Sequence, residues 1–530
     1  MASRRVFLQR LLQLSSLAAL SQAFPGYAAE RSQAYPFTLG VASGSPRADS
    51  IILWTRLLAD PLSPVPLAPI PLKVIWEIAE DEQFRQIAAK GEITALPELA
   101  HSVHAEATGL KPGRWYWYRF MHGDAISPVG RTRTTPEADS MSNCKVALAS
   151  CQHWEFGEFA AHRHIAAAHP DLVVFNGDYI YEWGPYDLKH PAQARRRDIE
   201  SFSLSEYRAR YAQYKSDQQL QAAHLAAPWL VTWDDHEIAN DYANDRDERM
   251  DPRFTDRRAA AYQAFYEHMP VRLHQPVPRG NEFAALRIYD RCDWGRLIRF
   301  HILDARQYRS YQACTPNQRG GSSMVTPAAC SDLRDPTRTM LGHEQEQWLT
   351  RGLSKSTARW NTIVQQTLMA QCRRHNTLNS ATNTAEYKIW TDGWDGYPMA
   401  RQRLLQSLQI AKAQNPVVWS GDVHTFYAAS LRADFQRPVS ADNPVLGAEY
   451  CVSSVTSNSM PQEETDQLVQ HNPHLHFGRS DTRGFIIADI SESRMQIQMM
   501  ALQDVSKADG GVSVLKTFIT EDGRPGVQTG

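Results

Sequence analysis

The sequence lacks a strong net charge, a hydrophobic run long enough to cross a membrane, and any internal repeat or low-complexity tract. Its 56 Lys and Arg residues nearly balance 58 Asp and Glu residues, for a formal net charge of -2. No whole-molecule field attracts nucleic acid or an anionic membrane, so we infer no nucleic-acid partner. The apolar stretch at residues 11–24 is interrupted by Gln and Ser and is too short to be a transmembrane anchor.

The N-terminus carries an export signature. An arginine pair, Arg4 and Arg5, precedes the short apolar stretch, and the small residues Gly26 and Ala28 follow it at a plausible cleavage spacing. This pattern predicts a removable twin-arginine signal at residues 1–29, recognised by the twin-arginine translocase, and a periplasmic or secreted mature protein. A basic amphipathic helix in a cytoplasmic protein is the alternative.

The sequence has no CxxC pair, which argues against a zinc knuckle or a dithiol redox motif. Its seven cysteines are an odd number, so in an exported protein at least one stays outside an internal disulfide. Cys314 and Cys330 bracket a loop rich in Gly, Ser, Pro and Thr, and we predict that a disulfide closes it. Cys151 is the thiol that we expect to remain free.

The length of 530 residues suits two domains. Short apolar runs separated by turn residues predict an all-β immunoglobulin/fibronectin-like sandwich at residues 30–138. After the polar stretch at residues 134–143, strand-like runs alternate with helical stretches, which predicts an α/β layered domain at residues 139–530. The expected strands of the first domain include residues 37–42, 50–55, 72–78 and 115–120.

Four strand-like runs of the second domain end in side chains that bind metals. The run at residues 146–150 precedes Cys151, and the run at 172–175 precedes Asp178. In an open α/β sheet, ligands collect beyond the carboxyl ends of the strands, so neighbouring strands would bring these groups together. The other two runs, at residues 229–233 and 416–420, lead into Asp234, Asp235, His236 and Glu237 and into Asp422 and His424.

A thiol, a phenol, an imidazole and several carboxylates together suit a pair of cations for phosphoester hydrolysis. Asp178 would bridge the two ions. Asp422 and His424 lie two residues apart, so an extended backbone would point both into the cleft. Thiolate and phenolate ligands from Cys151 and Tyr181 favour a ferric ion, whereas carboxylates suit a harder ion such as calcium.

Each of these residues has an ordinary structural explanation when it is taken alone. A cysteine at a strand end is commonly a small buried hydrophobe, and Tyr181 could be a rim aromatic. Asp234 and Asp235 could cap a helix. The combination of all four strand ends is what favours a metal centre.

Several segments resemble the PhoD-type alkaline phosphatases and phosphodiesterases, a branch of the calcineurin-like metallophosphoesterase superfamily. Four of them carry the candidate ligands: residues 150–153, 177–182, 233–237 and 421–424. The resemblance covers nearly the whole chain and implies a catalytic domain built as a layered β-sandwich flanked by helices. Further matching segments are residues 40–46, 303–309, 341–345 and 392–398.

The resemblance implies a secreted enzyme that uses Fe3+ with one or two Ca2+ ions to hydrolyse phosphate mono- and diesters. Asp178 and Asp422 would face calcium, with a further ligand from residues 234–240, where we favour Asp235 and Asn240. His153 is a second-tier metal candidate. The residues implied to hold iron are Cys151, Asp178, Tyr181 and His424.

The predicted mechanism is attack of a metal-bound hydroxide on phosphorus, with Asp178 at the centre of the site. His236 would stabilise the transition state or protonate the leaving oxygen. Arg306 and Arg309 would clamp the phosphate, with exposed salt bridges as the alternative for both residues.

Two other functions compete with this interpretation. One is a phosphodiesterase directed at phospholipids or cell-wall polymers. The other is a secreted, non-catalytic binding protein with a degenerate metal site. The segment after residue 508 could form a tail or a lid over the site.

Overall fold

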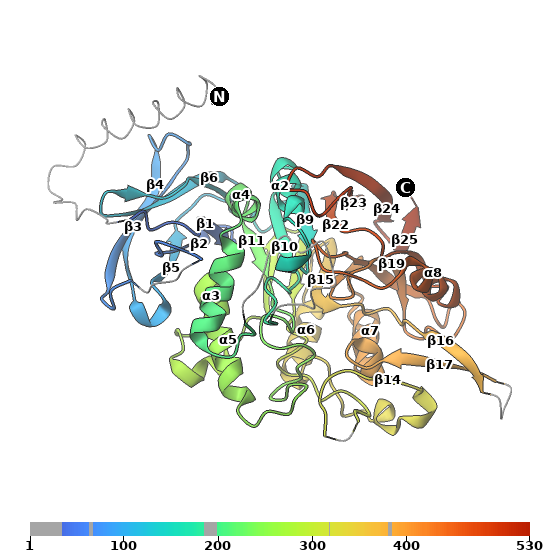
Figure 1. The fold of residues 1–530 in the computed structure, drawn as a ribbon. Helices are drawn as coiled ribbons and strands as arrows, with labels where there is room; N and C mark the ends of the chain where they lie inside the picture. Colours follow the sequence, from blue (N-terminus) through green and yellow to red (C-terminus); the bar gives the residue numbers. More distant parts are fainter. Residues whose placement is uncertain (1–33, 63–66, 185–198, 317, 380–383, 530) are drawn as a thin grey trace.

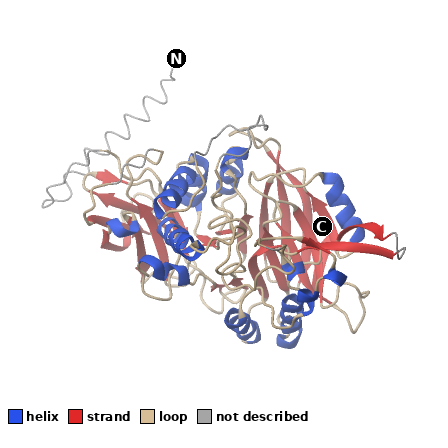
Figure 2. Ribbon diagram, turned by 60° about the horizontal axis from the view of Figure 1, so that its bottom comes forward, coloured by secondary structure: helices blue, strands red, loops and turns tan. Residues whose placement is uncertain are grey.

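The computed structural model of the protein describes residues 34–62, 67–184, 199–316, 318–379 and 384–529. The predicted export signal at residues 1–29 lies outside these ranges. Within them, no helix is long and apolar enough to cross a bilayer. Two large sheets lie face to face, with helices on both outer sides (Figures 1 and 2).

Sheet A, the larger sheet, has a parallel centre. Strands β9, β10 and β11 pair in parallel with one another. The segment after residue 508 forms β24 and the edge strand β25, so it is neither a tail nor a lid. In order, the strands of sheet A are β25 (Arg524–Thr529), β24 (Val512–Glu521), β23 (Arg494–Leu502), β22 (Gly484–Ile490), β9 (Cys144–Ala149), β10 (Leu172–Phe175), β11 (Trp229–Val231), β1 (Val41–Gly44), β2 (Ser50–Arg56) and β5 (Ser102–Thr108).

Sheet B faces sheet A across a buried apolar layer that includes Val146 and Leu148 of sheet A and Phe300 and Trp419 of sheet B. Its strands β13, β15, β18 and β20 run in parallel. A small sheet of β14 (Met324–Val325), β17 (Thr384–Trp390) and β16 (Arg374–Asn379) lies apart. The strands of sheet B are, in order, β12 (Asp290–Trp294), β13 (Ile298–Ile302), β15 (Trp360–Thr367), β18 (Pro416–Gly421), β20 (Val445–Cys451), β19 (Phe426–Arg432) and β21 (Leu475–Arg479).

The helices cover the outer faces of the two sheets, which confirms the predicted layered sandwich flanked by helices. Apolar side chains of α2, α3, α4 and α5 join one core cluster with sheet A, and those of α6 and α7 join another with sheet B. Ser203 and Glu206 form a capping box that starts α3. Among the described residues, the α-helices are α2 (Ala160–Ala167), α3 (Leu204–Lys215), α4 (Gln218–Ala226), α5 (Phe254–His268), α6 (His343–Ser354), α7 (Pro398–Ala411) and α8 (Gln462–His471).

The N-terminal region has two sheets around its own core, but one of them continues into sheet A. Buried Val41 and Leu53 pack against Val74 and Tyr118 of the second sheet. Gly44 of β1 pairs in parallel with Trp229 of β11, so sheet A crosses the predicted boundary at residues 134–143. The immunoglobulin-like assignment stays a prediction. The second sheet consists of β4 (Ile87–Ala95), β3 (Leu72–Ala79), β6 (Trp115–His122), β7 (Ala125–Ile126) and β8 (Gly130–Arg133).

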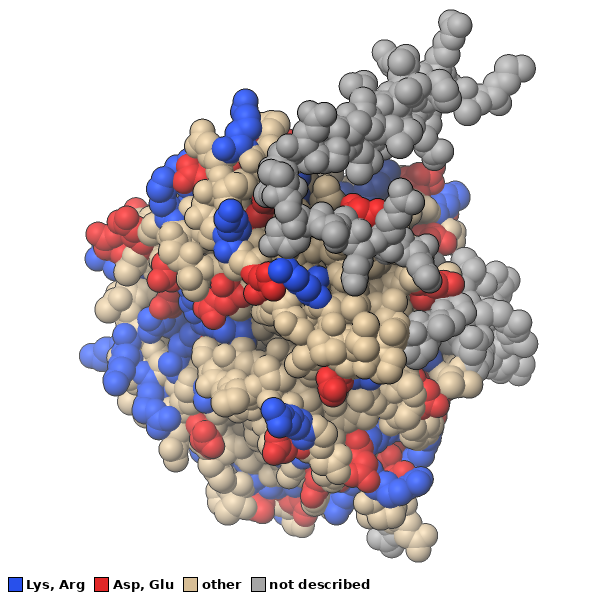
Figure 3. All heavy atoms as spheres, turned by 90° about the vertical axis from the view of Figure 1, so that its left-hand side faces the viewer, with Lys and Arg blue, Asp and Glu red and all other residues tan. Residues whose placement is uncertain are grey.

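Basic and acidic side chains are interspersed over the face on this N-terminal side of the molecule (Figure 3). The distribution agrees with the balanced charge of the sequence.

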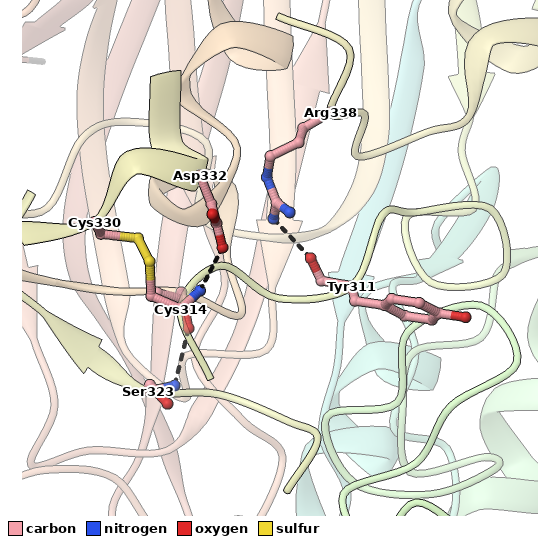
Figure 4. Close-up of a disulfide and its surroundings, with 7 residues drawn as sticks. Tyr311, Cys314, Ser323, Cys330, Asp332 and Arg338 are labelled. Atoms are coloured by element: carbon pink, nitrogen blue, oxygen red, sulfur yellow. Dashed lines mark hydrogen bonds between the residues drawn. A yellow bond between two sulfur atoms is a disulfide. The ribbon is translucent and has the colours of Figure 1, made fainter. Parts of the chain in front are cut away.

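The predicted disulfide between Cys314 and Cys330 is confirmed (Figure 4). The backbone N–H of Cys314 also donates to the carboxylate of Asp332 at 3.0 Å, which fixes one end of the closed loop. Cys151 is not part of any disulfide, as predicted.

Candidate metal centre

The candidate ligands meet where the parallel strands of both sheets end. Because β9, β10 and β11 are neighbours, Cys151, Asp178 and Asp234 follow them at one edge of sheet A. Strand β18 belongs to sheet B, so the four strands are not all neighbours in one sheet. Asp422 still reaches the site because the sheets face each other: a Cβ added to Gly421 would lie 2.5 Å from Ser150 Oγ.

Four candidate ligands have a left-handed backbone. The φ angles are 59° at Cys151, 56° at Asp178, 63° at Asp422 and 53° at His424. The predicted extended conformation at Asp422 and His424 is therefore wrong, because β18 ends at Gly421 and the chain turns there. Non-glycine residues rarely adopt this region, and such strain collects at functional sites.

The residues expected to hold iron lie together. Ligand atoms of Cys151, Asp178 and His424 are all within 4.8 Å of one another. The Tyr181 hydroxyl donates to Asp178 Oδ2 at 2.8 Å, and its oxygen lies 3.1 Å from His424 Nε2. Four side chains from three separated segments thus converge on one small volume.

Burial disfavours the anionic forms of two of these ligands. It raises the pKa of the Cys151 thiol well above its ordinary value, and the Asp178 carboxylate adds to the effect. Burial, together with Asp178 and Cys151, likewise raises the pKa of the Tyr181 phenol. The protein alone keeps both groups protonated, whereas a cation at this point would favour their anions.

A second cluster consists of Asp234, Asp235 and Asp422, whose ligand atoms also lie within 4.8 Å of one another. Burial and repulsion between these carboxylates raise the pKa of Asp234 well above its ordinary value and that of Asp422 to about 7, although Arg306 opposes both shifts. Asp178 and His236 form a further group with Asp235, which links this cluster to the first.

The donor set fits bound cations. Each of the four central carboxylates keeps one buried oxygen without a hydrogen-bond partner, and a buried carboxylate oxygen is costly unless it is paired or coordinates a metal. A cation placed among these oxygens would compensate their mutual repulsion. The atoms are Asp178 Oδ1, Asp234 Oδ2, Asp235 Oδ1 and Asp422 Oδ2.

All of the ligand assignments stay predictions, and two of the residues, Asn240 and His153, have other contacts in the structure. The backbone N–H of Asn240 donates to Glu182 Oε1 at 2.8 Å, a contact that does not involve its side chain. His153 Nδ1 accepts a hydrogen bond from the Glu155 N–H at 3.4 Å, and its ring centroid lies 4.5 Å from that of Tyr181. His153 therefore lies beside the site and keeps its place as a second-tier candidate.

Arg306 is completely buried among the carboxylates. Its Nε donates to Asp234 and its Nη1 to Asp392, while Nη2 lies 3.4 Å from Asp422 Oδ1 and 3.5 Å from Asp235 Oδ1. The alternative of an exposed salt bridge is therefore wrong. A direct contact with substrate remains a prediction for Arg306.

Arg309 is buried beside Arg306 and uses its donors on the protein. Its Nη2 donates to Asp392 Oδ1 at 2.6 Å and to the Tyr242 carbonyl at 2.7 Å, and its Nη1 donates to the Asp392 carbonyl at 2.8 Å. This arrangement rules out the exposed salt bridge and does not favour the predicted phosphate clamp. It indicates a structural role, in which Arg309 holds Asp392 against Arg306.

His236 has the surroundings of a proton donor. Its Nδ1 lies 2.8 Å from Glu182 Oε2, and its ring packs on Tyr181 with the centroids 4.2 Å apart. Burial lowers its pKa, but Asp235, Glu182 and Asp178 outweigh burial and raise it well above the ordinary value. The imidazole is therefore protonated when the neighbouring carboxylates are charged.

Sequence reasoning missed the role of Glu237. Its Oε1 accepts from the Tyr179 N–H at 2.6 Å, and its Oε2 accepts from the N–H groups of Asp178 at 3.0 Å and Asp234 at 2.8 Å. One buried carboxylate thus ties the loop after β10 to the loop after β11. Its position directly after Asp234, Asp235 and His236 was the available signal.

The polar segment at residues 453–459 was also missed. Its Ser457 Oγ lies 2.7 Å from Tyr181 Oη, and the carbonyl oxygen of Asn458 lies 2.6 Å from His424 Nδ1. Arg483 Nη1 donates to the Ser457 carbonyl at 2.8 Å and to the His424 carbonyl at 3.0 Å. Serine-rich segments are common in surface loops, so no local signal pointed to this role.

Comparisons with known proteins agree with the geometry. The profile of the PhoD-like phosphatase family matches residues 146–499, and that of the PhoD-like phosphatase N-terminal domain matches residues 20–136. Alkaline phosphatase D from Bacillus subtilis (strain 168) is 40% identical over 517 residues, which cover 96% of this chain and 84% of that protein.

Solved structures give the same relationship. The structure of PhoD aligns with a TM-score of 0.86 at 40% identity and covers 94% of this chain and 93% of its own. A purple acid phosphatase from yellow lupin (Lupinus luteus) seeds aligns with a TM-score of 0.54 at 12% identity, covering 92% of this chain and 74% of its own. This second likeness concerns the fold alone.

Proposed function

The chain belongs to the PhoD-like phosphatase family, and from this premise we propose an exported, metal-dependent enzyme that hydrolyses both phosphate monoesters and phosphodiesters. Membership makes it a phosphoric ester hydrolase. A non-catalytic binding protein, considered from the sequence, is therefore not supported. Metal dependence, diester hydrolysis and export are our proposals.

One observation carries the metal dependence: the linked ligand clusters, in which four buried carboxylate oxygens lack a hydrogen bond. Fe3+ would be held by Cys151, Asp178, Tyr181 and His424. Ca2+ would be held by Asp178, Asp235, Asn240 and Asp422. Bound there, the cations would neutralise phosphoryl oxygens and lower the pKa of the attacking water.

The reaction breaks one phosphorus–oxygen bond and forms another. The oxygen of water bonds to phosphorus, and the ester oxygen departs with its electron pair and takes up a proton. We assign the donation of this proton to His236, because its ring lies beside the candidate ligands Asp178 and Asp235 and Glu182 fixes the ring through Nδ1. The proton that the water loses balances the one that the leaving oxygen gains.

The test is hydrolysis of bis(4-nitrophenyl) phosphate and 4-nitrophenyl phosphate by the purified mature protein, before and after chelation. Metal content is measured on the same samples. We expect turnover of both esters, its loss on chelation, and its return when iron and calcium are added together. Full turnover by metal-free protein would overturn the metal dependence, and inertness of metal-replete protein on both esters would overturn the proposed activity.

Export has its own test. Replacing Arg4 and Arg5 together by Lys should retain the protein in the cytoplasm as an uncleaved precursor, because the arginine pair is the feature that the twin-arginine route recognises. Equal amounts of mature protein outside the cytoplasm with and without the substitutions would contradict the predicted route.

A further inference from the structure

A groove opens beside the candidate metal centre, at the edge of sheet B where β15 and β18 end. We call it the substituent groove. The residues that matter in its lining are Thr367, Leu368, Arg374, Trp390, Val423 and Met460.

The inner end of the substituent groove shares its backbone with the candidate ligands. Val423 stands between Asp422 and His424, and Thr367 pairs with Gly421, the residue before Asp422. Met460 follows closely on Asn458, whose carbonyl oxygen contacts His424 Nδ1 at 2.6 Å. The groove therefore adjoins the loop that carries Asp422 and His424.

The walls of the groove are largely apolar, and several of their side chains are partly exposed to solvent. Val423, Trp390 and Met460 are half-buried, while Leu368 is buried at the base. Apolar surface that a ligand removes from water contributes favourably to binding. The groove thus suits an aryl or alkyl group.

Two charged side chains, Asp395 and Arg374, line the groove. Its one carboxylate, Asp395, is already paired: Oδ1 accepts from Arg401 Nη1 at 2.5 Å, and Oδ2 accepts from the Cys372 N–H at 2.8 Å. The Arg374 guanidinium also lines the groove. A positive charge therefore faces a group that enters the groove.

We propose that the substituent groove binds the organic group carried by the substrate phosphorus, and that it selects neutral or anionic apolar groups, aryl groups above all, over cationic ones. This inference rests on the proposed function. Val423, Trp390 and Met460 enclose the apolar part of that group, and Arg374 attracts a negative charge on its outer end.

Phosphonates provide the test, because each carries a single organic group on a bond that the enzyme does not hydrolyse. Methyl-, phenyl-, 4-carboxyphenyl- and 4-(trimethylammonio)phenylphosphonate are compared as competitive inhibitors of 4-nitrophenyl phosphate hydrolysis by the metal-loaded enzyme. An inhibition constant does not depend on the fraction of active protein, so partial misfolding of a variant does not distort the comparison.

We expect phenylphosphonate to inhibit at least about tenfold more tightly than methylphosphonate. The carboxyphenyl compound should bind about fivefold more tightly than the trimethylammonio compound, because a partly exposed ion pair contributes modestly. Arg374→Gln should bring this last ratio close to one, and Trp390→Ala should reduce the preference for phenyl over methyl. Arg351→Gln, an exposed arginine on α6, is the matched control and should retain both preferences.

Equal inhibition by all four compounds, or a charge preference that survives Arg374→Gln, would overturn the groove assignment. The proposed function would then still stand, since hydrolysis of the chromogenic ester is measured in the same assay. Absence of any hydrolysis would instead overturn the proposed function itself.

Discussion

The hydroxyl of Ser457 lies 2.7 Å from the phenol oxygen of Tyr181, although 276 residues separate the two in the sequence. The same hydroxyl lies 2.9 Å from the Cys151 carbonyl oxygen. Ser457 thus contacts two of the residues that we propose as iron ligands, and partners of this kind orient a ligand and tune its donor strength.

Ser457→Ala should change the electronic properties of the proposed iron site. Without this hydrogen bond the phenolate becomes a stronger donor, so the tyrosinate-to-iron absorption band should move to lower energy, and turnover should fall about tenfold. The matched control is Ser459→Ala, since Ser459 contacts Thr425 at 2.9 Å. Identical spectra for the two variants would contradict the assigned role.

His236→Ala should reduce kcat by about a hundredfold or more while iron and calcium content stay unchanged, because a proton donor contributes about that much. Metal analysis and kinetics on the same preparation make the comparison. Loss of metal from the variant would move His236 from proton donor to ligand, a role that its grouping with Asp178 and Asp235 also permits.

Gly177→Ala should disrupt the site through its backbone. Gly177 has a φ of +99°, and an added Cβ would lie 2.5 Å from both N and Cβ of Asp234. We expect a loss of more than about 3 kcal/mol in the free energy of unfolding, together with loss of bound metal. Denaturant unfolding and metal analysis measure both effects.

Gly109→Ala is the control for this substitution. Gly109 has a comparable φ of +75° but nothing within 4 Å of an added Cβ, so only the conformational cost of about 1 kcal/mol applies. If the two alanine variants unfold alike, the contact with Asp234 is not what demands glycine at position 177.

Lys215 should make the stability of the protein depend on pH. Its side chain is buried, with Nζ 4.1 Å from the centre of the Trp54 ring, and burial lowers its pKa from 10.5 to about 7. Between these two values the unfolded chain binds the extra proton. The stability contributed by Lys215 should therefore be greatest above pH 10.5 and fall as the pH drops towards 7, by at most about 1.4 kcal/mol per pH unit.

Lys215→Met should remove this part of the pH dependence, since methionine fills a similar volume and does not titrate. The measurement compares the change in the free energy of unfolding between pH 7 and pH 10 in the wild-type protein and in the variant. If the free energy of unfolding changes with pH equally in both proteins, the charge of Lys215 is stabilised in the folded state and its pKa is not lowered.

Much of the site was readable from sequence because its signals are local. Cys151, Asp178 and Asp422 each follow a short apolar run, and a buried parallel strand has that appearance whatever its neighbours are. The spacing of Cys314 and Cys330 and the composition of the loop between them likewise predicted the disulfide. The alternation of such runs with helical stretches was likewise enough to predict an α/β layered domain.

The tertiary structure decided what depends on contacts between distant segments. It assigned β18 to sheet B, joined β1 to β11, and gave Asp422 and His424 a left-handed backbone in place of an extended one. It also buried Arg306 among four carboxylates and brought Ser457 to Tyr181. The sequence determines which groups end each strand, because burial and turn chemistry act over a few residues. Which strands meet, and which polar residues lie behind the ligands, follows only from the packing of the whole chain.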